Sequence, residues 1–176
     1  MSKAFDELFA ADMARYDGTP DRWHKKFHFL LRKAQTADNK IVRRIYAYWF
    51  ASFNRKYGNE VHHGAKIGKG FRIVHPYGIT INYRAILGEN VNVHKGVTIG
   101  KEHRGKREGA PIIGNCVYIG INATIVGKVK IGNDVVIAPN TFVNCDVPDH
   151  SVVFGNPCII KHRDNATEKY VINIAK

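Results

Sequence analysis

Aliphatic residues recur at every sixth position along the second part of the chain, from Val61 to Val143. They fall into three uninterrupted series: Val61, Ile67 and Ile73; then Ile81, Leu87, Val93 and Ile99; then Ile113, Ile119, Ile125, Ile131, Ile137 and Val143. Glycine follows many of them directly, and small or β-branched residues often stand four positions later. An amphipathic helix has spacings of three and four and a half-buried strand a spacing of two, so a period of six excludes both as the sole pattern.

This period predicts a mainly β fold, a parallel β-helix in which each six-residue unit forms one short strand and a corner. Three units would close a triangular coil, with the aliphatic side chains inside and successive coils paired as parallel strands about 4.8 Å apart. Corners favour residues that tolerate left-handed backbone angles, and the expected ones are Asn90, Asn115, Asn122 and Asn133. A β-sandwich of short strands is the alternative, which the regular register disfavours.

Two interruptions of the period are candidate sites, because irregular segments on a rigid scaffold often carry function. The step from Ile73 to Ile81 is eight residues, which leaves a two-residue insertion within the segment VHPYG at 74–78. Between Ile99 and Ile113, residues 101–112 (KEHRGKREGAPI) are too polar for the wall and are predicted to protrude as an arm.

Residues 1–58 have the composition of basic amphipathic helices, unlike the repeat region at 59–160. Asp38 or Asn39 could cap a helix that stops at Gly58, and Pro20 suits the start of an earlier helix. A helical cap on the repeat domain is the preferred interpretation, and peripheral association of these helices with a membrane is the alternative. Residues 161–176 are expected to form a C-terminal tail.

Composition adds few constraints. The 176 residues suit one sizeable domain with a helical region, and without an apolar run or signal sequence a cytoplasmic location is expected. The net charge of +12 suits any polyanion, but without a recognised motif no nucleic-acid partner is expected. The cysteines form neither a CxxC nor a Cys/His cluster, so Cys116, Cys145 and Cys158 are interpreted as reduced packing residues and no metal site is predicted.

Five segments together resemble the hexapeptide-repeat acyltransferases, in particular serine acetyltransferases and exopolysaccharide O-acetyltransferases. They are EVHHGAKIGKG, VHPYGITIN, VHKGVTIG, PIIGNCVYIGINATIVGKVKIGNDVVIAPNTFV and VPDHSVVFGNPCIIK, and the resemblance covers residues 59–161. It implies a left-handed β-helix, a homotrimer, and acetyl-CoA as a cosubstrate bound in the groove between neighbouring subunits.

The resemblance also implies the catalytic pair. His75 matches the family's histidine base, and Glu60 matches the carboxylate that orients it, where the serine enzymes more often have Asp. An imidazole suits this role because a hydroxyl is too weakly acidic to attack a thioester unaided, and a carboxylate would hold its tautomer. No serine or cysteine matches a covalent nucleophile, so direct transfer is expected.

Further positions are assigned to the two substrates. CoA contacts in the family are largely main-chain, and with two basic residues for the phosphates the cofactor candidates are Gly100, Lys101, Gly120, Ile121, Ala138, Pro139, Lys161 and Arg163. A backbone N–H near Gly100 and Lys101 is the candidate oxyanion donor. The acceptor-side candidates are Tyr77, Asn82, His94, His103, Arg104 and Arg107.

Three departures from the serine enzymes favour a sugar or polysaccharide-precursor hydroxyl as the acceptor. Val74 replaces an acidic residue, and Gly109 and Ala110 replace an Arg-His pair, so both charged ends of serine would lose partners. Serine O-acetylation is the alternative, and a non-catalytic or metal-binding scaffold is a second one. The latter is disfavoured because His62 and His63, adjacent on a strand, would point in opposite directions.

Overall fold

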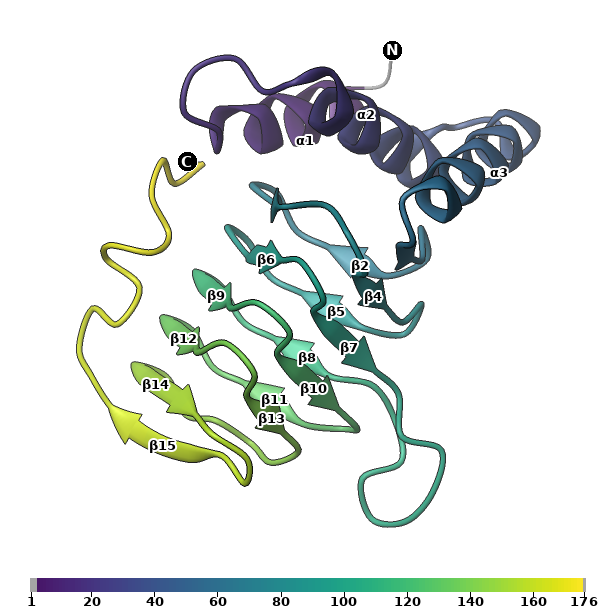
Figure 1. Ribbon diagram of the computed structural model, residues 1–176. Helices are drawn as coiled ribbons and strands as arrows, with labels where there is room; N and C mark the ends of the chain where they lie inside the picture. The colour runs from purple at the N-terminus through teal and green to yellow at the C-terminus, as the bar shows by residue number, and fades with distance from the viewer. Residues whose placement is uncertain (1–2, 176) are drawn as a thin grey trace.

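The chain winds around one axis as a parallel β-helix whose three walls are sheets of short strands (Figure 1). The structure is a computed structural model that describes residues 3–175. Sheet A has the order β1-β4-β7-β10-β13, sheet B the order β11-β8-β5-β2, and sheet C the order β15-β14-β12-β9-β6-β3. All described strand pairs are parallel except β14 with β15. The strands are β1 (Glu60–Val61), β2 (Lys66–Ile67), β3 (Arg72–Val74), β4 (Thr80–Ile81), β5 (Ile86–Leu87), β6 (Asn92–His94), β7 (Thr98–Gly100), β8 (Ile112–Ile113), β9 (Val117–Ile119), β10 (Thr124–Val126), β11 (Lys130–Ile131), β12 (Val135–Ile137), β13 (Phe142–Val143), β14 (Ser151–Phe154) and β15 (Ile159–His162).

The aliphatic residues of the six-residue period form the core columns. In sheet A, Ile81 pairs with Val61 on one side and Ile99 on the other, and the column continues to Ile125 and Val143. All five side chains are buried. Stacking identical positions removes apolar surface from water in every coil while the backbone bonds run between coils. The predicted fold class, a β-helix of hexapeptide repeats with a helical N-terminal region, is confirmed.

Left-handed residues stack at two of the three edges of the prism. The edge where sheet B turns into sheet C has positive φ at Gly70, Asn90, Cys116, Asp134 and His150, and the edge from sheet C into sheet A at Gly78, Gly96, Asn122 and Asn140. Asn90 and Asn122 therefore have the predicted role. Asn115 and Asn133 do not: each precedes a left-handed residue, and its side-chain oxygen accepts the N–H of a neighbouring coil, from Glu89 and Asn115 respectively.

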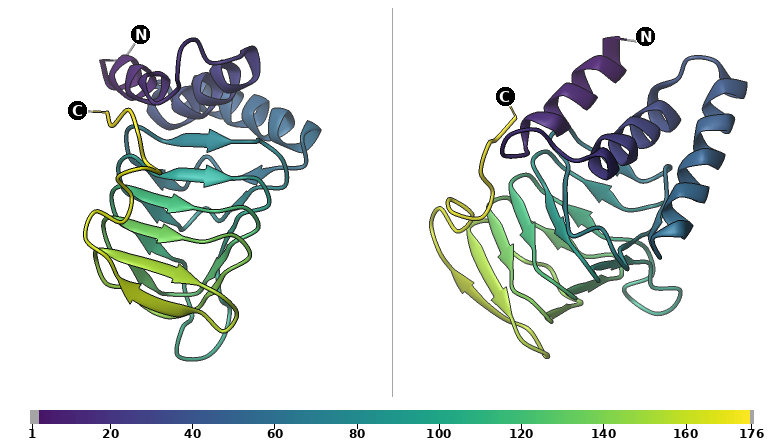
Figure 2. Two further views of the ribbon diagram at one scale, coloured as in Figure 1. Left: turned by 60° about the vertical axis from the view of Figure 1, so that its left-hand side comes forward. Right: turned by 45° about the horizontal axis from the view of Figure 1, so that its top comes forward.

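Three helices lie across the first coil (Figures 1 and 2). They are α1 (Lys3–Ala14), α2 (Arg22–Thr36) and α3 (Lys40–Lys56). Asn39 rather than Asp38 caps α3. Pro20 is not the first helical residue of α2, because Asp21 takes the N-cap position and accepts the N–H of His24.

A buried ionic cluster joins α1 and α2 to the open end of the β-helix. Asp12 accepts hydrogen bonds from Arg32 at 2.8 and 2.9 Å, contacts the ring of His28 at 3.0 Å, and accepts the N–H of Phe71. Arg32 also donates to the carbonyls of Ile67 and Gly68. Burial alone would raise the pKa of Asp12, but the charges and hydrogen bonds of His28 and Arg32 outweigh it and lower that pKa. The first coil has no preceding coil to pair with, so the cluster provides hydrogen-bond partners for its free backbone groups.

The C-terminal segment runs back along the β-helix from β15 to α1 (Figure 1). Asn92 donates to the carbonyl of Tyr170, and Asn90 both accepts the N–H of Ala175 and donates to its carbonyl. Asn173 contacts Asp17, beyond the end of α1. Of the tail expected at 161–176, residues 161 and 162 belong to β15 and residue 176 lies outside the described residues.

None of the helices in residues 3–175 combines the length and apolar character needed to cross a membrane.

Candidate active site

The two-residue insertion forms an exposed turn that carries His75. The turn leaves β3 at the edge between sheets C and A and re-enters the wall at β4. His75 has φ 58° and is exposed, and its carbonyl accepts the N–H of Tyr77 at 2.9 Å. Left-handed backbone at a residue with a Cβ costs about 1–2 kcal/mol, and such strain often accompanies functional residues.

Asn59 holds this turn from one coil earlier. Its side-chain nitrogen donates to the carbonyl of Pro76 and its oxygen accepts the N–H of Ile79, both at 2.9 Å. Asn59 is buried, so these two bonds fix both ends of the inserted segment. Sequence reasoning missed this residue because it precedes the first repeat and belongs to no motif.

Glu60 begins β1 directly beneath the same turn. It pairs with Thr80, and its N–H donates to the carbonyl of Ile79 at 2.7 Å. Its side chain is exposed, and within residues 3–175 no hydrogen bond or ion pair joins it to His75. The predicted pairing of Glu60 with His75 therefore stays a prediction.

His94 lies on the same edge, in the next coil along the chain. Its ring centroid is 6.3 Å from that of His75 and 4.8 Å from that of Tyr118, which in turn is 4.9 Å from Tyr170. Burial, and then the charges of His75 and Arg72, lower the pKa of His94 to about 4. Its Nδ1 is buried with no hydrogen-bond partner in the described part of the chain, so a neutral imidazole with a free polar atom stands beside the candidate base.

Four cofactor candidates continue this edge. His94 is followed on the next coils by Gly120 and then Ala138, with Ile121 and Pro139 beside them. However, the N–H groups of Gly120 and Ala138 donate to Ile137 and Val153, and Pro139 has none. CoA bound here would therefore meet carbonyls and side chains rather than those N–H groups. The N–H groups of Gly120 and Ala138 are thus no longer expected among its main-chain contacts.

Of the other candidates, Tyr77 is exposed in the same turn as His75, and the rest lie apart from His75 within one chain. Gly100 ends β7, Lys101 follows it, and Asn82 follows β4, all at the edge from sheet A into sheet B. Lys161 is in β15 with its amine 5.8 Å from the Phe154 ring, whereas Arg163 bonds to His150 at the opposite end of the strands of sheet C.

The arm is a hairpin-like loop whose base is fixed and whose tip is exposed (Figure 1). Glu102 and Gly109 exchange backbone hydrogen bonds at 2.9 and 3.1 Å, and Lys128 donates to the carbonyl of Arg107. The exposed residues of this loop include His103, Arg104 and Arg107. The loop leaves the edge between sheets A and B, whereas His75 lies at the edge between sheets C and A. Gly109 has φ 137°, and a Cβ there would stand 3.0 Å from Lys128. Packing at the base of the arm thus explains this glycine without reference to the acceptor.

His62 and His63 do not point in opposite directions: their rings stack 4.6 Å apart, because both follow the two-residue β1 and lie in a turn. No cluster of three potential metal ligands occurs in residues 3–175. Cys145 and Cys158, distant in sequence, approach to 3.7 Å between their Sγ atoms as free thiols.

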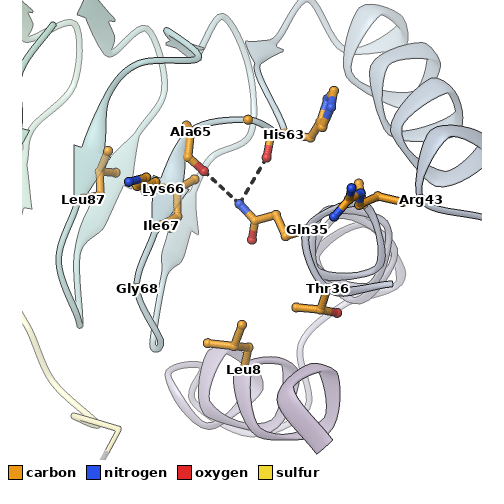
Figure 3. Close-up of a pocket in the computed structure, with 12 residues that line it drawn as sticks. Leu8, Gln35, Thr36, Arg43, His63, Ala65, Lys66, Ile67, Gly68 and Leu87 are labelled. Carbon is orange, nitrogen blue, oxygen red and sulfur yellow. Dashed lines mark hydrogen bonds between the residues drawn. The ribbon is translucent and has the colours of Figure 1, made fainter. Parts of the chain in front are cut away.

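A pocket of about 630 Å³ lies away from this edge, between the helices and the first coil (Figure 3). Gln35 crosses it and donates to the carbonyls of His63 and Ala65, and Arg43 and Lys66 also line it. Neither His75 nor Glu60 borders it. The candidate base thus lies outside this pocket, exposed at the edge between sheets C and A.

Comparisons with known proteins agree with this architecture. Residues 110–145 match the family model described as bacterial transferase hexapeptide (six repeats). A serine acetyltransferase from Staphylococcus aureus is 41% identical over 109 residues, which are 61% of this chain and 50% of that protein. One from Helicobacter pylori is 37% identical over 99 residues, 56% of this chain and 58% of that protein. The chain thus spans about half the length of these relatives.

Solved structures resemble the whole fold. A serine acetyltransferase from Brucella abortus superposes with a TM-score of 0.75 at 26% identity, over 93% of this chain and 71% of that one. Soybean serine acetyltransferase gives 0.73 at 26% identity, over 91% and 70%.

These comparisons contradict the preference for a sugar or polysaccharide-precursor acceptor, since the relatives and structures are named serine acetyltransferases. That preference rested on Val74, Gly109 and Ala110, and at Gly109 the structure supplies a packing reason for the change. The resemblance itself is confirmed: the chain carries the bacterial transferase hexapeptide repeat and is similar, in sequence and in fold, to serine acetyltransferases.

Proposed function

We propose that the chain transfers the acetyl group of acetyl-CoA to the hydroxyl of L-serine, releasing O-acetyl-L-serine and CoA. The observation that carries the proposal is the likeness to proteins named serine acetyltransferases, at 41% identity over 109 residues in one of them. The exposed His75 on its inserted turn supports it, because the reaction needs a base near neutrality that the acceptor can reach.

In the proposed reaction His75 takes the hydroxyl proton as the serine oxygen attacks the thioester carbonyl. The tetrahedral intermediate then collapses, the carbon–sulfur bond breaks, and the CoA sulfur leaves as a thiol after receiving that proton. Glu60 would stabilise the imidazolium from the beginning of β1. His94 is half-buried and neutral, and it would offer its other ring nitrogen, Nε2, to the acceptor or the intermediate beside His75.

The arm is the proposed source of the groups that bind the serine carboxylate. Arg104 and Arg107 are exposed guanidinium groups, which pair with carboxylates through two parallel hydrogen bonds. In the proposal, these two arginines bind the serine carboxylate in place of the Arg-His pair that Gly109 and Ala110 replace. Gly100 and Lys101, where the arm begins, stay the candidates for the oxyanion and the thioester.

A homotrimer is part of the proposal, because one chain does not bring these groups together. His75 lies at the edge between sheets C and A, whereas Gly100, Lys101 and the arm leave from the edge between sheets A and B. In a rotationally symmetric ring, the edge of one copy that carries His75 would lie against the edge of the next copy that carries the arm. Each interface would then complete one site.

Thiol release from acetyl-CoA, followed with a panel of acceptors, tests the proposal. We expect release with L-serine, much less with D-serine, and none above the hydrolytic background with amino-sugar or nucleotide-sugar hydroxyls. Release with a sugar but not with L-serine would overturn the assignment of the acceptor while leaving acetyl transfer intact.

A further inference from the structure

The two helices α2 and α3 concentrate the positive charge of the molecule. Together they contain ten Lys and Arg residues and neither Asp nor Glu, in a chain whose net charge is +12. Arg32 is neutralised in the buried cluster with Asp12, and most of the others are exposed. A strong field of one sign over two adjacent helices favours an anionic partner.

Helix α3 presents a second apolar face to solvent. It buries Phe50 against the rest of the molecule, yet Ile41, Ile45, Tyr48 and Trp49 are 70%, 43%, 67% and 50% exposed. Ile41, Ile45 and Tyr48 follow the spacing of one helix face. Helix α3 extends outward at the end of the β-helix (Figures 1 and 2). So many large apolar side chains on one exposed helix mark a surface that is covered in use.

A shallow groove joins the apolar face to the basic residues. It has a volume of about 390 Å³ and is lined by Leu30, Trp49 and Phe53 with Lys26 and Lys56 at its sides. The Lys26 amine stands 5.4 Å from the centre of the Phe53 ring. Apolar walls flanked by ammonium groups match a lipid, whose acyl chain is apolar and whose phosphate is anionic.

We propose that α3 binds the surface of an anionic phospholipid bilayer, lying in the plane of the interface without crossing it. Ile41, Ile45 and Trp49 enter the boundary between headgroups and acyl chains, where Trp and Tyr side chains are enriched. Lys and Arg residues of α2 and α3 meet the phosphates, each contributing about 1 kcal/mol near an anionic surface. A two-fold contact between two copies of this face fits less well, because it would bring like charges together.

Co-sedimentation with vesicles tests the proposal, using the full chain. We expect binding to vesicles of phosphatidylcholine and phosphatidylglycerol in equal parts, none to phosphatidylcholine alone, and release at high salt because salt screens the attraction. Ile45→Glu should weaken binding by about tenfold or more, since it adds a negative charge and removes an inserted side chain.

Ile159→Glu is the matched control, because Ile159 is 53% exposed in β15 at the other end of the β-helix and the variant carries the same charge change. It should bind like the wild type. The proposal is wrong if neither vesicle binds the protein, if the control loses as much affinity as Ile45→Glu, or if Ile45→Glu changes the oligomeric state and not vesicle binding. Acetyl transfer assayed without vesicles should be the same in the wild type and in Ile45→Glu, so this test is separate from that of the proposed reaction.

Discussion

At the scale of single residues, His75 differs from every other corner residue in having two extra residues around it. Gly78, Gly96, Asn122 and Asn140 form one column along this edge, and the insertion adds His75, which is exposed, ahead of that column. Asn59 stabilises the turn by bonding to the carbonyl of Pro76 and to the N–H of Ile79. The main chain of the turn that carries the exposed imidazole is therefore held by a buried amide on another coil.

Asn59→Ala should lower both stability and the rate of acetyl transfer. The carbonyl of Pro76 and the N–H of Ile79 would lose their partners, which costs about 1–3 kcal/mol in unfolding free energy. Asn54→Ala is the control, because the side-chain amide of Asn54 is equally buried and donates to the carbonyl of Phe50 within α3. Urea unfolding and kcat should show that Asn59→Ala loses both stability and kcat, whereas Asn54→Ala keeps its kcat. A normal kcat in Asn59→Ala would contradict the positioning role.

The lowered pKa of His94 predicts a loss of stability on acidification. Its pKa of about 4 lies below the unfolded value near 6.5, so between these pH values the unfolded chain binds more protons. The contribution of His94 is complete above pH 6.5 and falls as the pH approaches 4. Melting temperatures measured from pH 7 to pH 4.5 should fall less in His94→Gln than in the wild type. Parallel curves for the two proteins would show that His94 titrates normally.

At the scale of elements, the sequence predicts the β-helix better than its attachments. The six-residue period places Ile81 against Val61 and Ile99, and the same register puts His94 next to Val74 and so close to His75. Periodicity states nothing about side chains that reach across elements. The Asp12 cluster bonds to Phe71 and Gly68, and Tyr170 returns from the tail to Tyr118, so these contacts depend on tertiary packing alone.

Asp12→Ala should detach the helices from the first coil. The substitution leaves the buried guanidinium of Arg32 without its carboxylate, a change that typically costs about 3–5 kcal/mol. Asp6→Ala is the control, since Asp6 is an exposed carboxylate on the same helix. Urea denaturation should shift strongly for the first variant and little for the second. Equal shifts would show that the buried cluster does not hold this joint.

At the scale of the whole molecule, the account depends on copies completing each other's sites. In one chain His75 and the arm leave from different edges of sheet A. The sequence alone could indicate both segments as interruptions of the period. Their separation became visible only in the structure, because it depends on which corner each interruption occupies.

Subunit mixing tests this arrangement. His75→Ala and a variant with Arg104 and Arg107 both changed to Ala should each be nearly inactive alone. When the two variants are refolded together in equal amounts, they should assemble at random into closed rings. One interface in four would then pair an intact His75 with an intact arm, so the mixture should regain about a quarter of the wild-type activity. Light scattering on the mixture would establish that trimers form. No recovery in a trimeric mixture would place His75 and the arm of each site in the same chain, or in no common site.

The central claim is that His75 catalyses acetyl transfer from acetyl-CoA to L-serine. The measurement that tests it most directly is the formation of O-acetyl-L-serine, followed by mass spectrometry for wild type and His75→Ala purified in parallel, with circular dichroism to verify equal folding. We expect product with the wild type and a rate lower by about 10²- to 10⁴-fold in the variant. No product with the wild type, or an undiminished rate in a folded His75→Ala, would contradict the account.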